Sequence, residues 1–120
     1  MNKIIALLLM LALLLSLCAC GTSEEEIRTE LIDNGWFCES TYDGNVFQRL
    51  IVFTDSNEYV KYTEKNGKPD SVEYGDFEVD GKKVLLYDSS ALVHHGIVTE
   101  YRYKNHTLLN GDNVYEIYDN

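Results

Sequence analysis

The sequence predicts a mainly β fold: an antiparallel meander of eight strands that follows one short helix. From residue 36 onwards, eight runs rich in β-branched and aromatic residues alternate with short segments of Gly, Asn and Asp, which is the pattern of hairpins. No segment between the runs is long enough for the helical crossovers that parallel strands need. Such a meander closes into a barrel or folds into a sandwich. We expect the barrel, because closure removes unpaired strand edges.

The beginning of the chain differs in character from the rest. Residues 1–3 form a short basic start and residues 4–17 an almost purely apolar run, which together are typical of a secretory signal. The alternative is an uncleaved anchor. Extended to Cys20, however, the apolar run has 17 residues, fewer than the roughly 20 that usually span a bilayer. We therefore expect export with cleavage, and we interpret residues 1–19 as the signal peptide.

The end of this run is Leu17-Cys18-Ala19-Cys20, with Gly21 after it. These residues resemble the lipobox of bacterial lipoproteins, in which Leu stands three residues before a cysteine and a small residue directly before it. The resemblance implies signal cleavage between Ala19 and Cys20 and lipidation of Cys20. It also implies that Cys18, which has the larger Leu17 before it, leaves with the signal peptide.

Lipidation would explain how the protein reaches a membrane. A lipoprotein cysteine carries a diacylglyceryl thioether, often with a further palmitate-like N-acyl chain. Each buried methylene contributes about 0.8 kcal/mol, and two chains anchor stably where one does not. The resemblance therefore implies that acylated Cys20 holds the protein to the lipid bilayer, with residues 20–23 as a lipidated tether. The expected location is the outer face of the bacterial cell membrane, or the periplasm or outer membrane of a Gram-negative cell.

The one predicted helix spans residues 24–33. Ser23-Glu24-Glu25-Glu26 fits a capping box, and three carboxylates in the first turn suit the helix dipole. Ile27 and Leu31 share one face at a spacing of four, and Asn34-Gly35 supplies a C-terminal stop. A second interpretation of the three carboxylates is a role at the membrane, since they lie close to the lipid site. We favour the first interpretation, because a helix start already explains their presence. This helix covers one side of the barrel or plugs one end, and the sequence leaves both options open.

The predicted strands span residues 36–42, 46–53, 58–63, 72–79, 82–87, 97–103, 107–109 and 114–118. The single proline, Pro69, falls in a predicted loop, since proline cannot donate to a strand ladder. Residues 46–53 are apolar on both faces, so alternation cannot orient them.

Alternation along the later strands predicts which side chains face inward. They include Phe77, Tyr101, Tyr103 and Tyr115. Eight strands leave an interior just wide enough for side chains or for one small ligand. Because the predicted inward residues are bulky, we expect a filled core.

A second resemblance covers about 85 residues. The chain contains in order "NGWF", "LIVFTDSNEY", "YGDFEVDGKKVLLY", "EYRYKNHTLL" and "NVYEIYD". This order is similar to that of small bacterial lipocalin-like domains. The resemblance implies that residues 24–120 form a lipocalin-like barrel with its N-terminal helix, and that Trp36 packs at one barrel end and closes it.

Charge narrows the classes of partner. The chain has 20 acidic and 10 basic residues and a net charge of −10, and every acidic residue follows Cys20. Loss of residues 1–19 would remove only Lys3 and leave −11. Nucleic acid and anionic lipid both attract clustered lysine and arginine, so this balance argues against contact of the domain surface with either.

The remaining candidate residues do not indicate an active site. His94-His95 are adjacent and would point to opposite sides of an extended segment, and with His106 they do not show the spacing of zinc ligands. We expect exposed loop histidines; the alternative is a weak metal site of one histidine with a nearby carboxylate. After lipidation of Cys20, only Cys38 remains as a thiol, and we expect it to be buried and inert rather than catalytic.

The sequence therefore predicts a binding protein rather than an enzyme. It contains no Ser-x-x-Lys, no Gly-x-Ser-x-Gly and no phosphate loop, and we expect no cofactor and no metal. The function that we expect is a membrane-anchored, non-catalytic binding or interaction module at the cell envelope, with an envelope or extracellular protein as its partner. The alternative is a carrier that holds a small apolar ligand inside the barrel.

Overall fold

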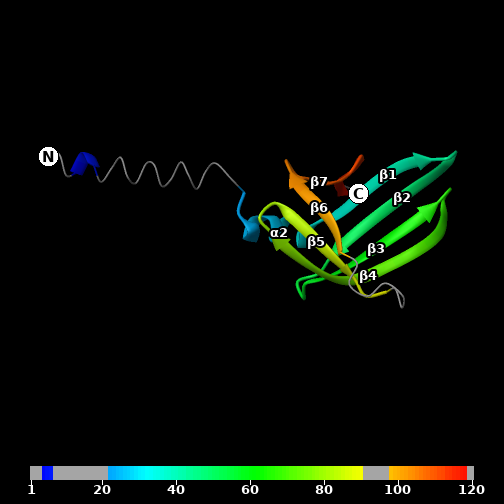
Figure 1. Cartoon of the computed structure of the whole chain (residues 1–120), viewed down its shortest axis with the longest axis horizontal. Helices are drawn as coiled ribbons and strands as arrows, with labels where there is room; N and C mark the ends of the chain where they lie inside the picture. Colours follow the sequence, from blue (N-terminus) through cyan, green and yellow to red (C-terminus); the bar gives the residue numbers. More distant parts are fainter. Residues whose placement is uncertain (1–3, 7–21, 91–97, 119–120) are drawn as a thin grey trace.

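The structure is a computed structural model, and it describes residues 4–6, 22–90 and 98–118 (Figure 1). The predicted cleavage and lipidation site, Ala19-Cys20, lies outside the described residues, as does most of the predicted signal peptide. The described domain consists of one helix followed by eight strands. The function of the chain must therefore be argued from this domain.

The eight strands form one closed antiparallel barrel in which β8 pairs back onto β1, so the predicted meander and its closure are confirmed. The strands are β1 (Gly35–Tyr42), β2 (Asn45–Phe53), β3 (Glu58–Lys65), β4 (Lys68–Asp80), β5 (Lys83–Asp88), β6 (Val98–Lys104), β7 (Thr107–Asn110) and β8 (Asn113–Tyr118). Each strand pairs with its neighbours in sequence, which short turns can connect.

The helix α2 (Glu24–Asp33) has the predicted bounds and the predicted N-terminal cap. The Ser23 hydroxyl accepts a hydrogen bond from the Glu26 amide at 3.2 Å. The helix ends differently from the prediction. Gly35 takes no left-handed conformation and is the first residue of β1, while the Asn34 side-chain amide donates to the Glu30 carbonyl at 2.9 Å. A side-chain cap therefore satisfies the last turn, and the chain enters β1 directly.

The prediction for Pro69 is wrong, because β4 begins at Lys68 and Pro69 lies inside it. Two features accommodate the missing N–H group. Among the described residues, 68–73 form strand pairs only with β3, and the other edge of this segment is bonded only from Tyr74 onwards, where the Tyr74 carbonyl accepts from the Ser89 amide at 2.9 Å. The ladder also shifts register between Thr63 and Glu64, opposite this segment. Edge strands and bulges are the places in a sheet where proline is tolerated. Lys82, predicted to begin the next strand, lies instead in the turn before β5.

Strands β1 to β4 are longer than the barrel requires. β1 pairs with β8 only over Gly35–Phe37, and β4 pairs with β5 only from Gly75 onwards. The other halves of these strands pair among themselves and project away from α2 (Figure 1). We call this part the sheet extension; it comprises residues 38–42, 45–50, 61–65 and 68–74. Gly75 lies at the junction, where a Cβ atom would overlap the Tyr87 carbonyl oxygen, so only glycine lets β4 approach β5 there.

The core lies inside the closed part of the barrel, and the predicted inward positions of Phe77, Tyr101, Tyr103 and Tyr115 are confirmed. Aromatic side chains occupy much of it, with edge-to-face contacts between Tyr101 and Tyr115 and between Phe53 and Phe77. The largest fully buried side chains are Trp36, Tyr59, Tyr101, Tyr115, Ile27, Leu31, Ile51, Leu86, Leu108 and Val84.

Candidate functional site

Helix α2 closes one end of the barrel by bonding to the turns there. In the β4–β5 turn, the Gly81 amide donates to the Glu24 carboxylate at 2.9 Å. In the β2–β3 turn, the Arg28 guanidinium donates to the Asp55 carbonyl at 2.9 Å and to the Asn57 side-chain oxygen at 3.0 Å. Of the two positions that the sequence left open for the helix, the structure therefore selects the plug.

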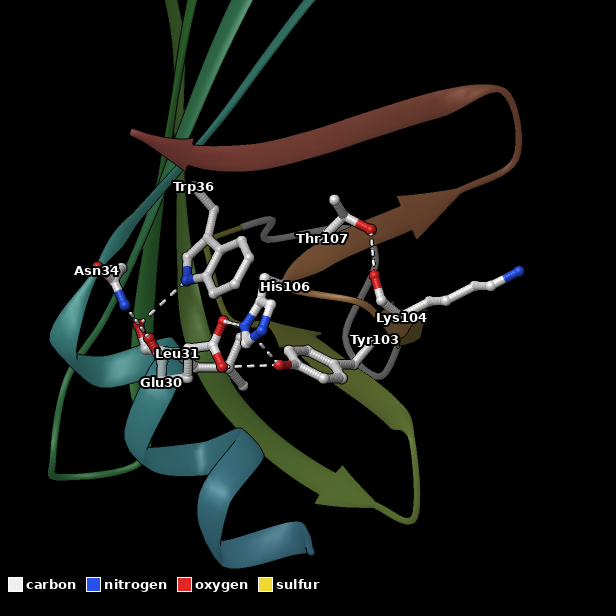
Figure 2. A network of polar contacts seen from close by, with 8 residues as sticks. All are labelled: Glu30, Leu31, Asn34, Trp36, Tyr103, Lys104, His106 and Thr107. Carbon is white, nitrogen blue, oxygen red and sulfur yellow. Dashed lines mark hydrogen bonds and ion pairs between the residues drawn. The ribbon is translucent and has the colours of Figure 1, made fainter. Parts of the chain in front are cut away.

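A third contact joins α2 to the β6–β7 turn (Figure 2). The Tyr103 hydroxyl donates to Glu30 Oε2 at 2.7 Å, and His106 Nδ1 lies 2.7 Å from Glu30 Oε1. His106 has a φ of 62° at a turn position that favours glycine or asparagine. Burial and the bond to Glu30 raise the pKa of Tyr103 to about 12. Since both groups bind one carboxylate, this arrangement fastens the helix to the turn.

Trp36 lies at the same end, fully buried against the apolar side of the helix. Its indole Nε1 donates to the Leu31 carbonyl at 3.2 Å, so the polar edge of the ring is satisfied (Figure 2). Ile27 and Leu31 are also fully buried. The side chain that the family resemblance assigns to a barrel end thus lies at the end that α2 covers.

Several predicted site residues cannot be placed. Ala19, Cys20, His94 and His95 lie outside the described residues. His106, the third histidine, is exposed in its turn and bound to Glu30 as described. Within residues 4–6, 22–90 and 98–118, no group of three or more His, Cys, Asp or Glu side chains is placed to hold a metal ion.

Cys38 is a free thiol, and it is buried as predicted. Burial raises its pKa, although the charges of Arg49 and Lys61 act in the other direction. Nearby, burial raises the pKa of Tyr101 to about 12 and raises that of Tyr115 as well. A thiol with a raised pKa is a poor nucleophile, so Cys38 does not have the properties of a catalytic cysteine.

The outer surface of β8 and β1–β4 carries two parallel rows of apolar side chains. Strand pairing aligns Tyr118, Gly35, Val52, Val60 and Tyr74 in the first row. It aligns Phe37, Leu50, Tyr62 and Val72 in the second. We call these nine residues the apolar outer face. Five of them, namely Val52, Val60, Val72, Tyr74 and Tyr118, are between 42 and 56 % exposed.

Acidic residues border the apolar outer face on several sides. Glu39 and Glu64 continue the alignment beyond the second row, Glu58 and Asp76 continue it beyond the first, and Glu116 lies at the edge. On β8 and β1–β3, alternation places no lysine or arginine outward. Because scattered apolar residues are normal but aligned ones with a polar border mark contact surfaces, this face is a candidate interaction site.

Sequence reasoning did not find this face. The pattern of the sequence does not show which tyrosines lie together on the outer surface. Apolar residues occur on both sides of β2, with Ile51 and Phe53 inward and Leu50 and Val52 outward, so no pattern within that strand identifies its outward residues. Only the register between strands aligns Val52, Val60 and Tyr74.

In the described parts of the chain, no helix is long and apolar enough to cross a membrane. Comparison of the chain with protein-family models, with curated proteins and with solved structures gives no match. The fold places the protein in a structural class, that of closed eight-stranded antiparallel barrels, here with a helix at one end and a sheet extension at the other. The function has to be argued from the surfaces of that barrel.

Proposed function

We propose that this chain is an exported bacterial lipoprotein, anchored through acylated Cys20, whose barrel acts as a non-catalytic interaction module at the cell envelope. The observation that carries the interaction role is the apolar outer face with its acidic border. The partner that fits it is a protein with an apolar surface and basic residues around that surface. Such a partner complements both the shape of a broad sheet and the charge around it.

The geometry of this face supports protein contact. Aromatic side chains are enriched at protein interfaces, and Phe37, Tyr62, Tyr74 and Tyr118 supply four of them. A hollow of about 220 Å³ opens on this face, where a side chain of the partner can anchor. Its lining comprises the apolar and aromatic residues Phe37, Leu50, Tyr62 and Tyr118 and the polar residues Gln48, Arg49 and Glu64.

The anchoring part of the proposal rests on the sequence. The lipobox-like residues precede the domain by only a few positions, and residues 22 and 23 lead directly into α2. Attachment at Cys20 would keep the helix-capped end of the barrel close to the membrane. The sheet extension, which projects away from α2, would then be presented to the surroundings (Figure 1).

The alternative function, a carrier of an apolar ligand inside the barrel, has less support. Trp36, Phe53, Phe77, Tyr101 and Tyr115 all lie in the buried core. Side chains of this size leave little interior volume in a barrel of eight strands.

Membrane fractionation tests the anchor. Cys20→Ala removes the acceptor of the lipid, so we expect it to move the protein from the membrane to the soluble fraction. Cys38→Ala is the matched control, since it also removes one thiol, and it should leave the protein with the membrane. Unchanged membrane association of Cys20→Ala would contradict lipid anchoring.

Site-specific photo-crosslinking tests the interaction. A photoreactive residue at Tyr74, on the apolar outer face, should give a reproducible protein adduct in the native membrane. Val60→Glu in the same chain should abolish the adduct, because a charge next to Tyr74 opposes apolar contact. The control places the photoreactive residue at Arg102, an exposed position on β6. The proposal is wrong if both positions give the same adducts, or if Val60→Glu changes nothing.

A further inference from the structure

The sheet extension separates its charges between its two faces. Arg49 pairs with Cys38 and Thr63, which are both buried, so its side chain lies on the inner side of the sheet. Lys61 lies on the same side, because its ammonium group donates to the hydroxyl of buried Tyr101 at 3.0 Å. The carboxylates around the apolar outer face lie on the opposite side. The inner face therefore carries more cations than carboxylates, since only Glu73, which pairs with Lys61 in the strand register, adds a negative charge to it among the described residues of the sheet extension, although the chain as a whole is acidic.

The inner cations form no ion pair within the described residues. No Asp or Glu oxygen of that part of the chain lies within 4.0 Å of Arg49, Lys61 or Lys65. Glu73, on the inner face of β4, accepts a hydrogen bond from the Tyr59 hydroxyl at 2.7 Å instead. A half-buried cation without an anion costs free energy. In a chain with twice as many acids as bases, the missing partner needs an explanation.

Neutral groups hold Arg49 and Lys61 in place. The Arg49 guanidinium donates to the Ser40 hydroxyl at 2.8 Å and lies 5.2 Å from the centre of the Phe47 ring. Lys61 is held by Tyr101, and the Lys65 ammonium lies 5.9 Å from the same Phe47 ring. Such contacts orient a cation without neutralising it. Within the described residues, the other N–H groups of Arg49 and Lys61 donate to no side chain.

The two cations also converge on one region. Arg49 pairs with Cys38 on one side and with Thr63 on the other, and Lys61 lies two residues before Thr63 on the same face. The charges of both Arg49 and Lys61 act on the thiol of Cys38. Phe47 is half-buried on the same inner face and offers an apolar surface next to Arg49. The region thus combines a guanidinium fork, an ammonium group and an aromatic ring.

We propose that the inner face of the sheet extension binds a small organic anion, whose carboxylate or phosphate group is held by Arg49 and Lys61 and whose apolar part lies against Phe47. A guanidinium fork matches both anionic groups, and the second cation adds charge without changing that geometry. The proposal is independent of the protein contact proposed above, because the two sites lie on opposite faces of the same strands.

Titration calorimetry of the full-length protein in a non-ionic detergent tests the site. The probes are benzoate, phenyl phosphate and inorganic phosphate, with benzyl alcohol as the uncharged analogue. We expect at least one of the aromatic anions to bind, and benzyl alcohol to bind about tenfold more weakly or not at all. Comparison of benzoate with phenyl phosphate decides which anionic group the site prefers.

Variants connect the binding to the named residues. Arg49→Gln and Lys61→Gln should each weaken anion binding by about tenfold or more, since each removes a charged hydrogen-bond donor. Lys104→Gln is the matched control, because it removes the same charge from an exposed position on β6 and should leave binding unchanged. Arg49→Lys keeps the charge but loses the fork, and intermediate weakening is expected. Circular dichroism checks that each variant is folded.

Three results would overturn the proposal. The first is that none of the anions binds at concentrations up to about 10 mM. The second is that binding is unchanged in both Arg49→Gln and Lys61→Gln, or falls equally in Lys104→Gln. The third is that benzyl alcohol binds as well as benzoate, or inorganic phosphate as well as phenyl phosphate. None of these results affects the photo-crosslinking test, so the two proposals fail separately.

Discussion

The two ends of this barrel treat their polar groups in opposite ways. At the end that α2 covers, Glu24, Arg28 and Glu30 each bind a group from a different turn. In the sheet extension, the side chains that Arg49 and Lys61 bind within the described part of the chain are neutral. At the helix-capped end, the polar groups bond to one another. The sheet extension instead has cations without a bound carboxylate on one face and exposed apolar residues on the other.

This difference indicates that stability and binding depend on different parts of the molecule. Buried apolar area and satisfied hydrogen bonds at the helix-capped end stabilise the fold. Two features do not help folding: the cations on the inner face of the sheet extension, and the apolar rows, which run from the sheet extension onto the outer wall of the barrel. A region that contributes little to stability and presents such groups is where binding is expected.

The sharpest test of this division compares a large side chain from each end. Trp36→Ala removes a fully buried ring, so it should lower the free energy of unfolding by about 3 to 5 kcal/mol. Tyr42→Ala, at an exposed position of the sheet extension, should change it by no more than about 0.5 kcal/mol. Urea unfolding measures both. Equal losses would show that the two ends contribute alike.

A smaller effect is expected at the contact between α2 and the β6–β7 turn. Tyr103→Phe removes the hydroxyl that donates to Glu30, and a hydrogen bond to a charged group contributes about 1.5 to 3 kcal/mol. Urea unfolding at neutral pH measures this loss. Unchanged stability would mean that Glu30 and His106 hold the turn without Tyr103.

The same residue predicts a response to alkaline pH. The pKa of Tyr103 is about 12 in the folded protein and about 10 in an unfolded chain. Between these values the unfolded state loses the proton while the folded state keeps it, so raising the pH favours unfolding. Stability should therefore fall as the pH rises from about 10 to about 12, and less steeply in Tyr103→Phe. Equal slopes would contradict this role of Tyr103.

Removal of the helix cap should have a still smaller effect. Ser23→Ala deletes the hydroxyl that accepts from the Glu26 amide, and loss of such a cap costs about 1 kcal/mol. Thermal unfolding measures the loss. Thr22→Ala, one residue earlier, is the control and should leave the midpoint unchanged. A Ser23→Ala protein as stable as the control would show that the three carboxylates of the first turn suffice.

The smallest effect on stability is expected for Arg49→Gln. Arg49 is half-buried and has no carboxylate within 4.0 Å among the described residues, so its loss should change the free energy of unfolding by about 0.5 kcal/mol or less. Together with weakened anion binding, this result would separate binding from folding at one residue. A large loss of stability would mean that Arg49 serves the fold.

Much of the fold was predictable because it depends on local signals. The bounds of α2 follow from the capping residue Ser23 and the spacing of Ile27 and Leu31, and both signals act within a few residues. Two-residue turns such as Asp43-Gly44 place residues at positive φ, which Gly and Asp tolerate. The failure at Pro69 has the same origin, since proline is tolerated in a strand only where an edge is free, and sequence does not show edges.

The candidate sites were not predictable in the same way. The apolar outer face consists of residues from five strands. Tyr118 and Tyr74 belong to it only because β8 closes onto β1 and β4 pairs with β3. The cationic inner face combines Arg49 and Lys61 from different strands. Neither strand contains a local motif for binding an anion.

The acidic character of the chain follows from its composition alone. The number and order of the elements and the places of most turns follow from the sequence as well, because propensity and turn chemistry act over short distances. The sequence also predicts, through the residues around Cys20, that the chain is carried to a membrane. Which side of β2 and β3 faces inward depends on the tertiary structure. Alternation relates the residues of one strand to each other, but where both sides are apolar, only barrel closure and register choose the inner side. That choice places Arg49 and Lys61 together inside and the apolar rows together outside.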